Sequence, residues 1–200
     1  MMALLLAGGR SSRARTHKGC RRVEGRPWLY RQCRVLRSQG FAQVRVVLGY
    51  SAMGAARCVP SGVRRIWNRN RAGGPFASLR AGLRAGLRGA RGPVLVVLVD
   101  AWLPSPATIC RLRLGLRGAY AAIPVWRGRG GHPALLSHEL AAAIAGSAHS
   151  PKERLDHVLA SAGARRIAVQ DRSVRRNMNR RRDWWLYLRC RKLRRPLWMG

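Results

Sequence analysis

A glycine pair near the start of the chain has the surroundings of a phosphate-binding turn. Gly8-Gly9 follows an apolar run and precedes basic residues, among them Arg13 and Lys18. Glycines let the backbone approach a phosphate closely, and successive backbone N–H groups in such a turn form an anion-binding concavity. The spacing matches neither a P-loop nor the dinucleotide-binding fingerprint. The turn therefore predicts a triphosphate site neutralised by Arg13 and Lys18, although such a pair alone is often an ordinary turn.

A single carboxylate, Asp100, ends the apolar run from Pro93 to Val99. Doubly wound folds bind ligands outside the carboxyl ends of their strands. An acid at that position needs a partner, and Mg²⁺ is the usual one in phosphate chemistry. We therefore expect Asp100 to bind Mg²⁺, with a salt bridge to an arginine as the alternative.

Three other segments are weaker candidates. Asn68 and the Gly74-Pro75 turn precede a helical pattern whose N-terminus offers free N–H groups to an anion, or is an ordinary helix entry. The basic turn 127–133 carries a histidine that either closes over a phosphorylated acceptor or is structural. The polar stretch 177–179 offers asparagine oxygens to a hard cation, or is a solvated turn.

Alternating strand and helix patterns must position these residues, and they predict parallel βαβ units. The fold class we expect is α/β, a single doubly wound domain with a mostly parallel, Rossmann-like sheet over residues 1–183. A basic, Trp-containing tail or helix follows over 184–200. The expected strands are 2–6, 43–48, 63–67, 94–99, 120–125 and 167–169, and the expected helices are 27–39, 76–87, 105–116, 135–144 and 151–162.

Composition limits the partners and the compartment. The net charge is +33, with 40 basic and seven acidic residues, which attracts polyanions but also fits an arginine-biased coding sequence. The five cysteines are odd in number and form no CxxC pair, which argues against a zinc site or a disulfide framework. The longest apolar run is far shorter than a membrane span, and the N-terminus reads as a strand rather than a signal peptide. We expect a cytoplasmic protein with no membrane partner.

These pieces in this order resemble the molybdenum-cofactor nucleotidyltransferases, the MobA/MocA-like NTP transferases. The family motif LAGGxSxRMGxxK stands here as residues 6–18, and Val99-Asp100 looks like the family's metal motif. Asn68 with residues 74–83 looks like its N…G(M/P)xxSLxxGL segment, and residues 131–133 look like its Gly-His-Pro turn. The resemblance covers residues 2–183.

The resemblance implies Mg²⁺-dependent transfer of a nucleoside monophosphate from an NTP to a phosphorylated small-molecule acceptor such as molybdopterin. A sugar phosphate or phospholactate is the alternative acceptor. The 6–9 segment resembles the guanylyl branch, whereas 76–79 and 131–133 resemble the cytidylyl branch, so GTP and CTP both stay open. The implied catalytic residues are Lys18, Arg13 and Asp100; the nucleotide-binding residues are Leu6, Ala7, Gly8, Gly9, Arg10, Ser11, Asn68, Gly74 and Ser78; the acceptor-binding residues are His132 and Arg129; and the metal ligands are Asp100 and Asn179.

The chain departs from the family motifs at three places. Ala14-Arg15 replaces Met-Gly, Ala101-Trp102 follows the metal aspartate, and Arg180 to Arg182 replace Thr-Pro-Glu. The alternative is therefore a non-catalytic member of the family that binds nucleic acid or another polyanion through its Arg-rich surface. In that case the tryptophans at positions 184, 185 and 198 stack on bases, rather than packing a final helix onto the fold.

Overall fold

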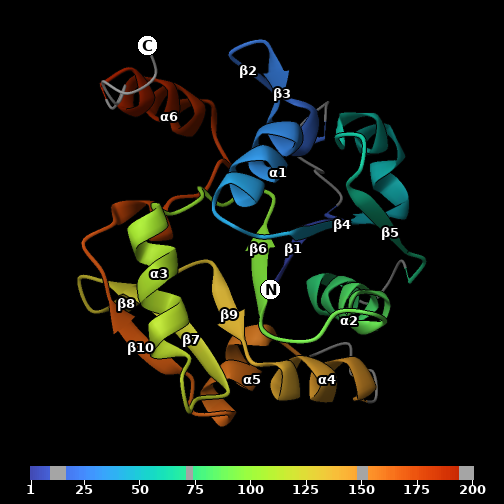
Figure 1. The fold of residues 1–200 in the computed structure, drawn as a ribbon. Coiled ribbons are helices and arrows are strands. Elements are labelled where there is room, and N and C mark those ends of the chain that lie inside the picture. Colours follow the sequence, from blue (N-terminus) through green and yellow to red (C-terminus); the bar gives the residue numbers. More distant parts are fainter. Residues whose placement is uncertain (10–16, 71–73, 148–152, 194–200) are drawn as a thin grey trace.

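The structure is a computed structural model that describes residues 1–9, 17–70, 74–147 and 153–193. An eight-stranded sheet runs through the molecule in the order β10-β7-β9-β6-β1-β4-β5, with β8 paired to β7 (Figure 1). A separate hairpin pairs β2 with β3. The strands are β1 (Met2–Ala7), β2 (Arg22–Val23), β3 (Arg26–Pro27), β4 (Gln43–Gly49), β5 (Arg64–Asn68), β6 (Val94–Leu98), β7 (Ala121–Trp126), β8 (Arg129–Gly130), β9 (Ala134–Leu136) and β10 (Arg165–Ala168).

The sheet is mostly parallel, as predicted. The central strand β1 pairs in parallel with β4 on one side and β6 on the other, and β4 pairs in parallel with β5. Strand β9 lies between β6 and β7 and is antiparallel to both, and the short β8 is also antiparallel to β7. The chain therefore goes from β1 out to β5 and returns to the other side of β1, which makes the β1–β6 border a switch point.

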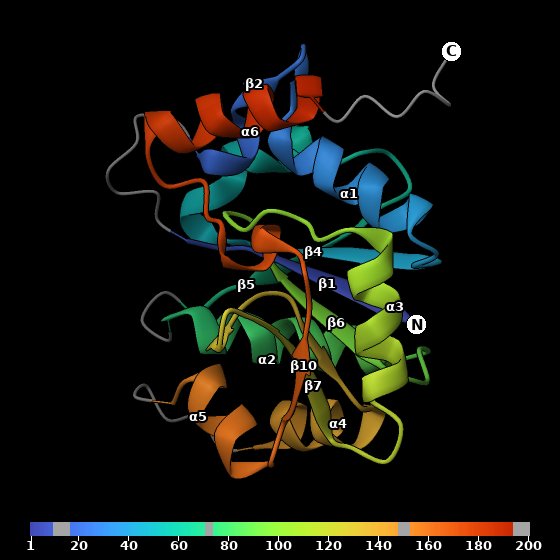
Figure 2. The same cartoon turned by 90° about the vertical axis from the view of Figure 1, so that its left-hand side faces the viewer.

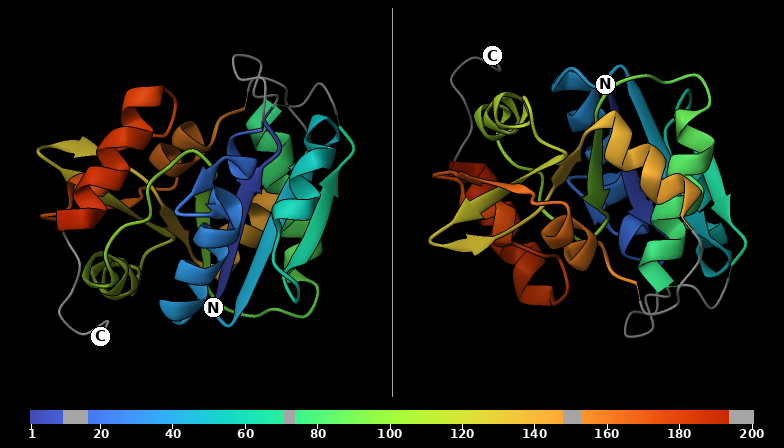
Figure 3. Two further views of the ribbon diagram at one scale, coloured as in Figure 1. Left: turned by 90° about the horizontal axis from the view of Figure 1, so that it is seen from above. Right: turned by 90° about the horizontal axis from the view of Figure 1, so that it is seen from below.

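Helices cover both faces of the sheet (Figures 2 and 3). Residues of β1 alternate between two cores, with Ala3 and Leu5 in one and Leu4 and Leu6 in the other. The first core includes α1 (Trp28–Ser38), η2 (Tyr50–Cys58), α3 (Pro106–Gly115) and α6 (Arg181–Leu193). The second includes α2 (Gly74–Leu87), α4 (His138–Gly146) and α5 (Leu155–Ser161). Short 3₁₀ turns, η1 (Lys18–Cys20) and η3 (Arg172–Arg175), complete the structure.

Two predicted elements were wrong in part. The expected helix 135–144 begins only at His138, because residues 134–136 form the buried strand β9. An apolar run this short does not distinguish a strand from a helix. The expected helix 151–162 begins at Leu155, and residues 151–152 lie outside the described part of the chain.

The expected Gly-rich turn 127–133 contains a hairpin. Arg127 and Gly128 have φ values of 49° and 73°, the backbone of a two-residue turn that joins antiparallel strands. No helix in the described residues has both the length and the apolar character to cross a bilayer.

Helix α6 is fastened to the fold by an aromatic cluster of four residues. Trp184 packs edge-on against Trp28 at 5.6 Å between ring centroids, and Tyr187 packs against Trp28 at 4.9 Å and Trp102 at 5.0 Å. Trp184 is only 5% exposed. It is therefore a core residue and has no face free for a nucleic-acid base, whereas Trp185 is exposed and Trp198 lies outside the described residues.

Replacing Trp184 should destabilise the protein, whereas replacing its neighbour should not. We expect Trp184→Ala to lower the free energy of unfolding by about 3–5 kcal/mol, because it leaves a cavity against Trp28. Trp185→Ala is the matched control: that side chain is 61% exposed, so a change of roughly 0.5 kcal/mol or less is expected. Urea denaturation measures both, and equal midpoints for the two variants would contradict the packing described.

Candidate active site

The carboxyl ends of β1 and β6 bring the two strongest sequence candidates to one edge of the sheet. Gly8 directly follows β1, and Asp100 follows β6 by one residue. The parallel pairing of β1 with β6 continues one residue beyond β6, because the Val99 N–H donates to the Leu6 carbonyl at 3.0 Å. This edge is the switch-point crevice in which open α/β sheets bind ligands.

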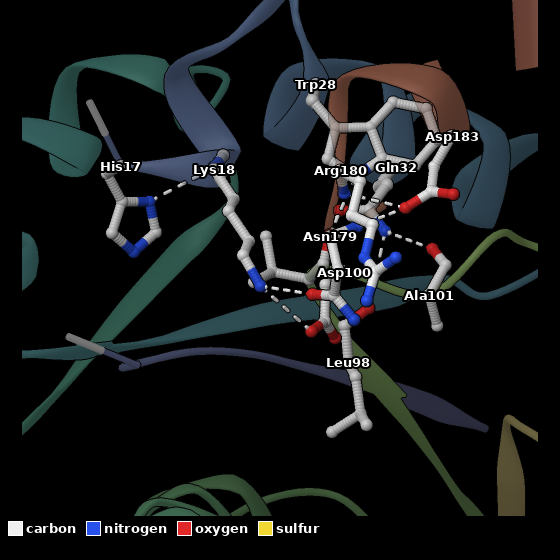
Figure 4. A network of polar contacts seen from close by, with 12 residues as sticks. His17, Lys18, Trp28, Gln32, Leu98, Asp100, Ala101, Asn179, Arg180 and Asp183 are labelled. Carbon is white, nitrogen blue, oxygen red and sulfur yellow. Dashed lines mark hydrogen bonds and ion pairs between the residues drawn. The ribbon is translucent and has the colours of Figure 1, made fainter. Parts of the chain in front are cut away.

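Lys18 connects three segments that are far apart in the sequence. Its Nζ lies 3.2 Å from Asp100 Oδ2 and 2.5 Å from Asn179 Oδ1 (Figure 4). The Lys18 and Asp100 side chains are 26% and 27% exposed, so the pair is open to a ligand. The structure therefore brings together the predicted catalytic lysine and both predicted metal ligands.

Two side chains of α1 and a backbone N–H from the segment before α6 hold the backbone around Asp100. The Trp28 indole N–H donates to the Val99 carbonyl at 2.7 Å, and the Gln32 amide donates to the Ala101 carbonyl at 3.1 Å. Met178 N–H donates to the Asp100 carbonyl at 2.6 Å. Each carbonyl from 99 to 101 has a partner, so the carboxylate of Asp100 projects from a fixed turn.

The position of Asn179 depends on the start of α6. Asp183 Oδ2 accepts the backbone N–H of Asn179 at 3.0 Å and that of Arg180 at 2.7 Å. An acid at the third helical position that accepts the N–H of the capping residue is half of a capping box. The next residue, Trp184, lies in the aromatic cluster, so the helix that holds Asn179 is itself anchored to α1.

Three of the predicted nucleotide residues, Asn68, Ser78 and Gly8, meet beside the end of β1. Asn68 Nδ2 donates to Ser78 Oγ at 3.0 Å. Ser78 lies in the first turns of α2, which begins at Gly74. A Cβ on Gly8 would lie 2.9 Å from Ser78 Oγ and 3.2 Å from the backbone nitrogen of Gly49. The backbone of β1 can approach that of β4 here only because residue 8 lacks a side chain.

The remaining predicted nucleotide residues differ in how they are placed. Leu6 and Ala7 are buried strand residues, and Gly9 is exposed beyond them. A Cβ on Gly9 would meet no described atom within 4 Å. Arg10, Ser11 and Arg13 lie outside the described residues.

His17 ties Lys18 to the end of β1. Its Nε2–H donates to the Ala7 carbonyl at 2.9 Å, and its Nδ1 accepts the Gly19 N–H at 3.1 Å. Both bonds fit one neutral tautomer. Burial lowers the pKa of His17, the bond to Ala7 opposes that shift, and the charge of Lys18 adds to it. The histidine is a structural brace whose neutral form fixes the turn that carries the lysine.

The predicted acceptor residues lie on the β9 side of Asp100. His132 N–H donates to the Val174 carbonyl at 2.8 Å. Burial lowers the pKa of its imidazole, attraction by Asp100 opposes this, and repulsion by Arg175 adds to it. Arg129 is exposed on β8 and does not contact the Lys18 centre. His132 is thus near Asp100, whereas Arg129 faces a neighbouring hollow.

The oxygen donors at Lys18 suit a hard divalent cation. One carboxylate and one amide oxygen already converge on a positive charge, the ammonium of Lys18. Mg²⁺ binds through one or two such protein oxygens and completes its shell with water and substrate phosphates. No group of three or more His, Cys, Asp or Glu side chains within the described residues offers a closed metal site. Two such oxygens fit an ion whose remaining ligands are water and substrate phosphates.

Three supporting residues were missed at the level of sequence. Trp28 and Gln32 share one face of α1 at i and i+4, which is a helical spacing, but their targets are carbonyls about 70 positions away. His17 stands next to Lys18 and gives no signal of its own. Only the i, i+4 pair could have been singled out from the sequence.

The fold and the site define a class: α/β nucleotidyltransferases with a glycine-rich turn and an acid at the switch point. The MobA-like NTP transferase domain model matches residues 3–170, and the chain belongs to that family. No curated protein matches the sequence.

Three solved structures with this fold share less than a quarter of their residues with the chain. A nucleotidyl transferase from a Methanothermobacter species has TM-score 0.76 and 23% identity, covering 96% of this chain and 97% of that one. Rv0371c from Mycobacterium tuberculosis, in complex with manganese, has TM-score 0.65 and 23% identity, covering 84% and 87%. Molybdopterin-guanine dinucleotide biosynthesis protein A from Archaeoglobus fulgidus has TM-score 0.70 and 18% identity, covering 96% and 100%. At these identities the comparisons establish the fold.

The close approach at Gly8 can be tested with its neighbour as a control. We expect Gly8→Ala to destabilise the protein by about 1–3 kcal/mol and to weaken nucleotide binding, because the added methyl displaces Ser78 or the strand at Gly49. Gly9→Ala adds the same methyl in open space, so its unfolding midpoint should match the wild type. Thermal unfolding with and without nucleotide measures both effects; equal losses in the two variants would sink the close-approach argument.

The His17 brace predicts a pH dependence of stability. Because burial holds the folded-state pKa below the ordinary value of about 6.5, the unfolded chain takes up the proton first as the pH falls. Stability from this group is therefore full above about pH 6.5 and decreases below it. We expect the urea midpoint to fall between about pH 7.5 and 5.5, and to fall less in His17→Gln. An identical fall in both proteins would show that other groups account for it.

Proposed function

We propose that the chain transfers a nucleoside monophosphate, GMP or CMP, from an NTP to a phosphorylated small-molecule acceptor such as molybdopterin. The observation that carries the proposal is the convergence of Asp100 and Asn179 on Lys18 beside the Gly8-Gly9 turn. Family membership supports the reaction class, and the manganese complex of a structural relative supports use of a divalent cation.

The chemistry requires positioning and charge neutralisation more than a strong base. The acceptor phosphate is already a nucleophile, and its attack on the α-phosphate releases pyrophosphate. Asp100 and Asn179 would hold Mg²⁺, which when bound neutralises negative charge on the phosphates. The Lys18 ammonium would neutralise the same charge, and the backbone N–H groups of the glycine turn would bind the triphosphate. His17 and the cap at Asp183 keep these groups in place before substrate binds.

The departures from the family motifs are accommodated in the described part of the site. The Trp102 ring lies 5.0 Å from that of Tyr187 within the aromatic cluster, and the backbone N–H of Trp102 donates to the Arg176 carbonyl at 3.0 Å. Arg180 contributes its backbone N–H to the cap by Asp183. These substitutions replace motif residues without moving Asn179 away from Lys18, which favours retained activity. Ala14 and Arg15 lie outside the described residues.

The decisive measurement is pyrophosphate release from GTP and from CTP, with Mg²⁺ and molybdopterin. We expect release with one of the two nucleotides, and a loss of at least about 100-fold in Asp100→Ala. Asp156→Ala is the matched control, because that carboxylate is exposed and pairs only with nearby Arg154. It should leave the rate within about twofold of the wild type.

No release from the folded wild-type chain with either nucleotide would overturn the transferase proposal for this acceptor. Repeating the assay with a sugar phosphate or phospholactate separates an acceptor mismatch from a non-catalytic protein. Binding of nucleotide that ignores Mg²⁺ and the base, and falls steeply with salt, would instead favour the polyanion binder.

A further inference from the structure

An arginine-lined hollow lies beside the candidate active site. It has a volume of about 450 Å³ and is lined by Trp126, Arg127, Arg129, Arg172, Arg175 and Arg176. Two segments far apart in the sequence form its walls: the β7–β8 hairpin and the η3 turn. Figure 1 shows the hairpin at the edge of the sheet, next to the chain that leads from β10 to α6.

The two walls are held together by close backbone packing. His132 N–H donates to the Val174 carbonyl, and a Cβ on Gly131 would lie 2.3 Å from that carbonyl oxygen. Arg175 donates to the Gly130 carbonyl at 2.6 Å. Arg172 donates to Cys190 Sγ at 3.2 Å. These contacts fix the positions of the two walls, so the arginines of the hollow are held close together by the fold.

The hollow carries five guanidinium groups without a compensating acid. Within the described residues, none of the five forms an ion pair with a carboxylate. The nearest acid in sequence, Asp171, accepts bonds from Ser105 N–H, Thr108 Oγ1 and Ser173 N–H. Burial acts to raise the pKa of Asp171, but these bonds outweigh burial and hold it below its usual value. The Asp171 carboxylate therefore accepts hydrogen bonds from uncharged donors and forms no ion pair with the arginines of the hollow.

The partners that the arginines do have leave their charge intact. A backbone carbonyl, a thiol sulfur and the Trp126 ring, which lies 4.8 Å from the Arg127 guanidinium, are all uncharged. Like charges this close repel one another, so the hollow lowers its energy by taking up an anion. Guanidinium groups suit phosphate in particular, because they bind its oxygens in pairs.

The segment that ends the hollow also leads to the metal ligands. The Arg176 carbonyl accepts the Trp102 N–H, and Asn177 pairs with Ala101 in an antiparallel bridge. Two residues further on, Asn179 reaches Lys18. Between these positions, the Met178 N–H donates to the Asp100 carbonyl, so this one segment joins the hollow to the turn that carries Asp100. A small molecule with its phosphate at Asp100 can therefore extend into the hollow.

We propose that this hollow binds a second anionic group of the acceptor, so that the acceptor is a small molecule with two separated anionic groups. The inference rests on the proposed transfer reaction and deepens it. One anionic group accepts the nucleotide beside Lys18, and the other pairs with Arg129, Arg172 and Arg175. A volume of about 450 Å³ suits a phosphorylated small molecule rather than a nucleic-acid duplex.

Calorimetric titration with inorganic pyrophosphate tests the hollow without any turnover. At about 0.15 M salt we expect the wild type to bind at two sites, one at Lys18 and one in the hollow. Arg129→Gln/Arg172→Gln should weaken one site by about a hundredfold, and Lys18→Ala should weaken only the other. Arg88→Gln/Arg91→Gln removes the same charge from exposed positions before β6 and should leave both sites unchanged.

Three results would overturn the proposal. The first is equal weakening by the two double variants, which would mean that net charge alone attracts the probe. The second is an unchanged pair of sites in Arg129→Gln/Arg172→Gln. The third is displacement of pyrophosphate from the hollow by a single-stranded oligonucleotide at equal charge concentration, which would assign the surface to nucleic acid. Absence of transfer activity, with the hollow still binding pyrophosphate, would refute the transferase proposal alone.

Discussion

The packing of α6 on α1 is the contact on which the site depends. Trp184 and Tyr187 meet the ring of Trp28, whose indole nitrogen also holds the carbonyl of Val99. One tryptophan therefore fixes both the strand end that presents Asp100 and the helix that carries the segment with Asn179. Because Asp100 and Asn179, whose side-chain oxygens meet Lys18, come from segments far apart in the sequence, only tertiary packing can bring them together. Lys18 then joins them from a third segment, whose orientation depends on His17.

Because acidic residues are few, many arginine side chains form their hydrogen bonds with backbone carbonyls. Arginines such as Arg37, Arg84 and Arg113 donate to backbone carbonyls instead of carboxylates. Arg84 and Arg80 both take carbonyls at the C-terminal end of α4, where the helix dipole favours a cation. Three carboxylates have other tasks, since Asp183 caps α6, Asp171 organises η3 and Asp100 faces Lys18. Glu24 and Asp156 do pair with arginines, Arg31 and Arg154. Carbonyl bonds orient a guanidinium without cancelling its charge, so the surface keeps its attraction for anions.

Sequence patterns predicted the elements that carry strong local signals. The buried strands β1, β4 and β6 and the helices α1 and α3 lie within a residue or two of their predicted positions, because apolar runs, caps and glycines mark them. Strand β9 was missed, since three apolar residues before a helix do not reveal their own conformation. The glycine turn, Asp100 and Asn179 could be singled out from motif order. The contact between Lys18 and Asn179 joins residues 161 positions apart in the sequence, and no local pattern predicts a contact at that separation. The burial of Trp184 likewise follows from a partner on α1 that the tail sequence does not show.

The family model and the folded unit end at different places. The match to the family model ends at residue 170, whereas the folded chain continues through Asn179 to the helix that ends at Leu193. A fragment cut at the end of the model would expose the rings of Trp28 and Trp102 to water and lose one of the two oxygens that meet Lys18. The burial of these two rings and the position of Asn179 therefore depend on the last helix. A fusion protein or an excised domain therefore has to include the chain up to the end of that helix if the site is to stay intact.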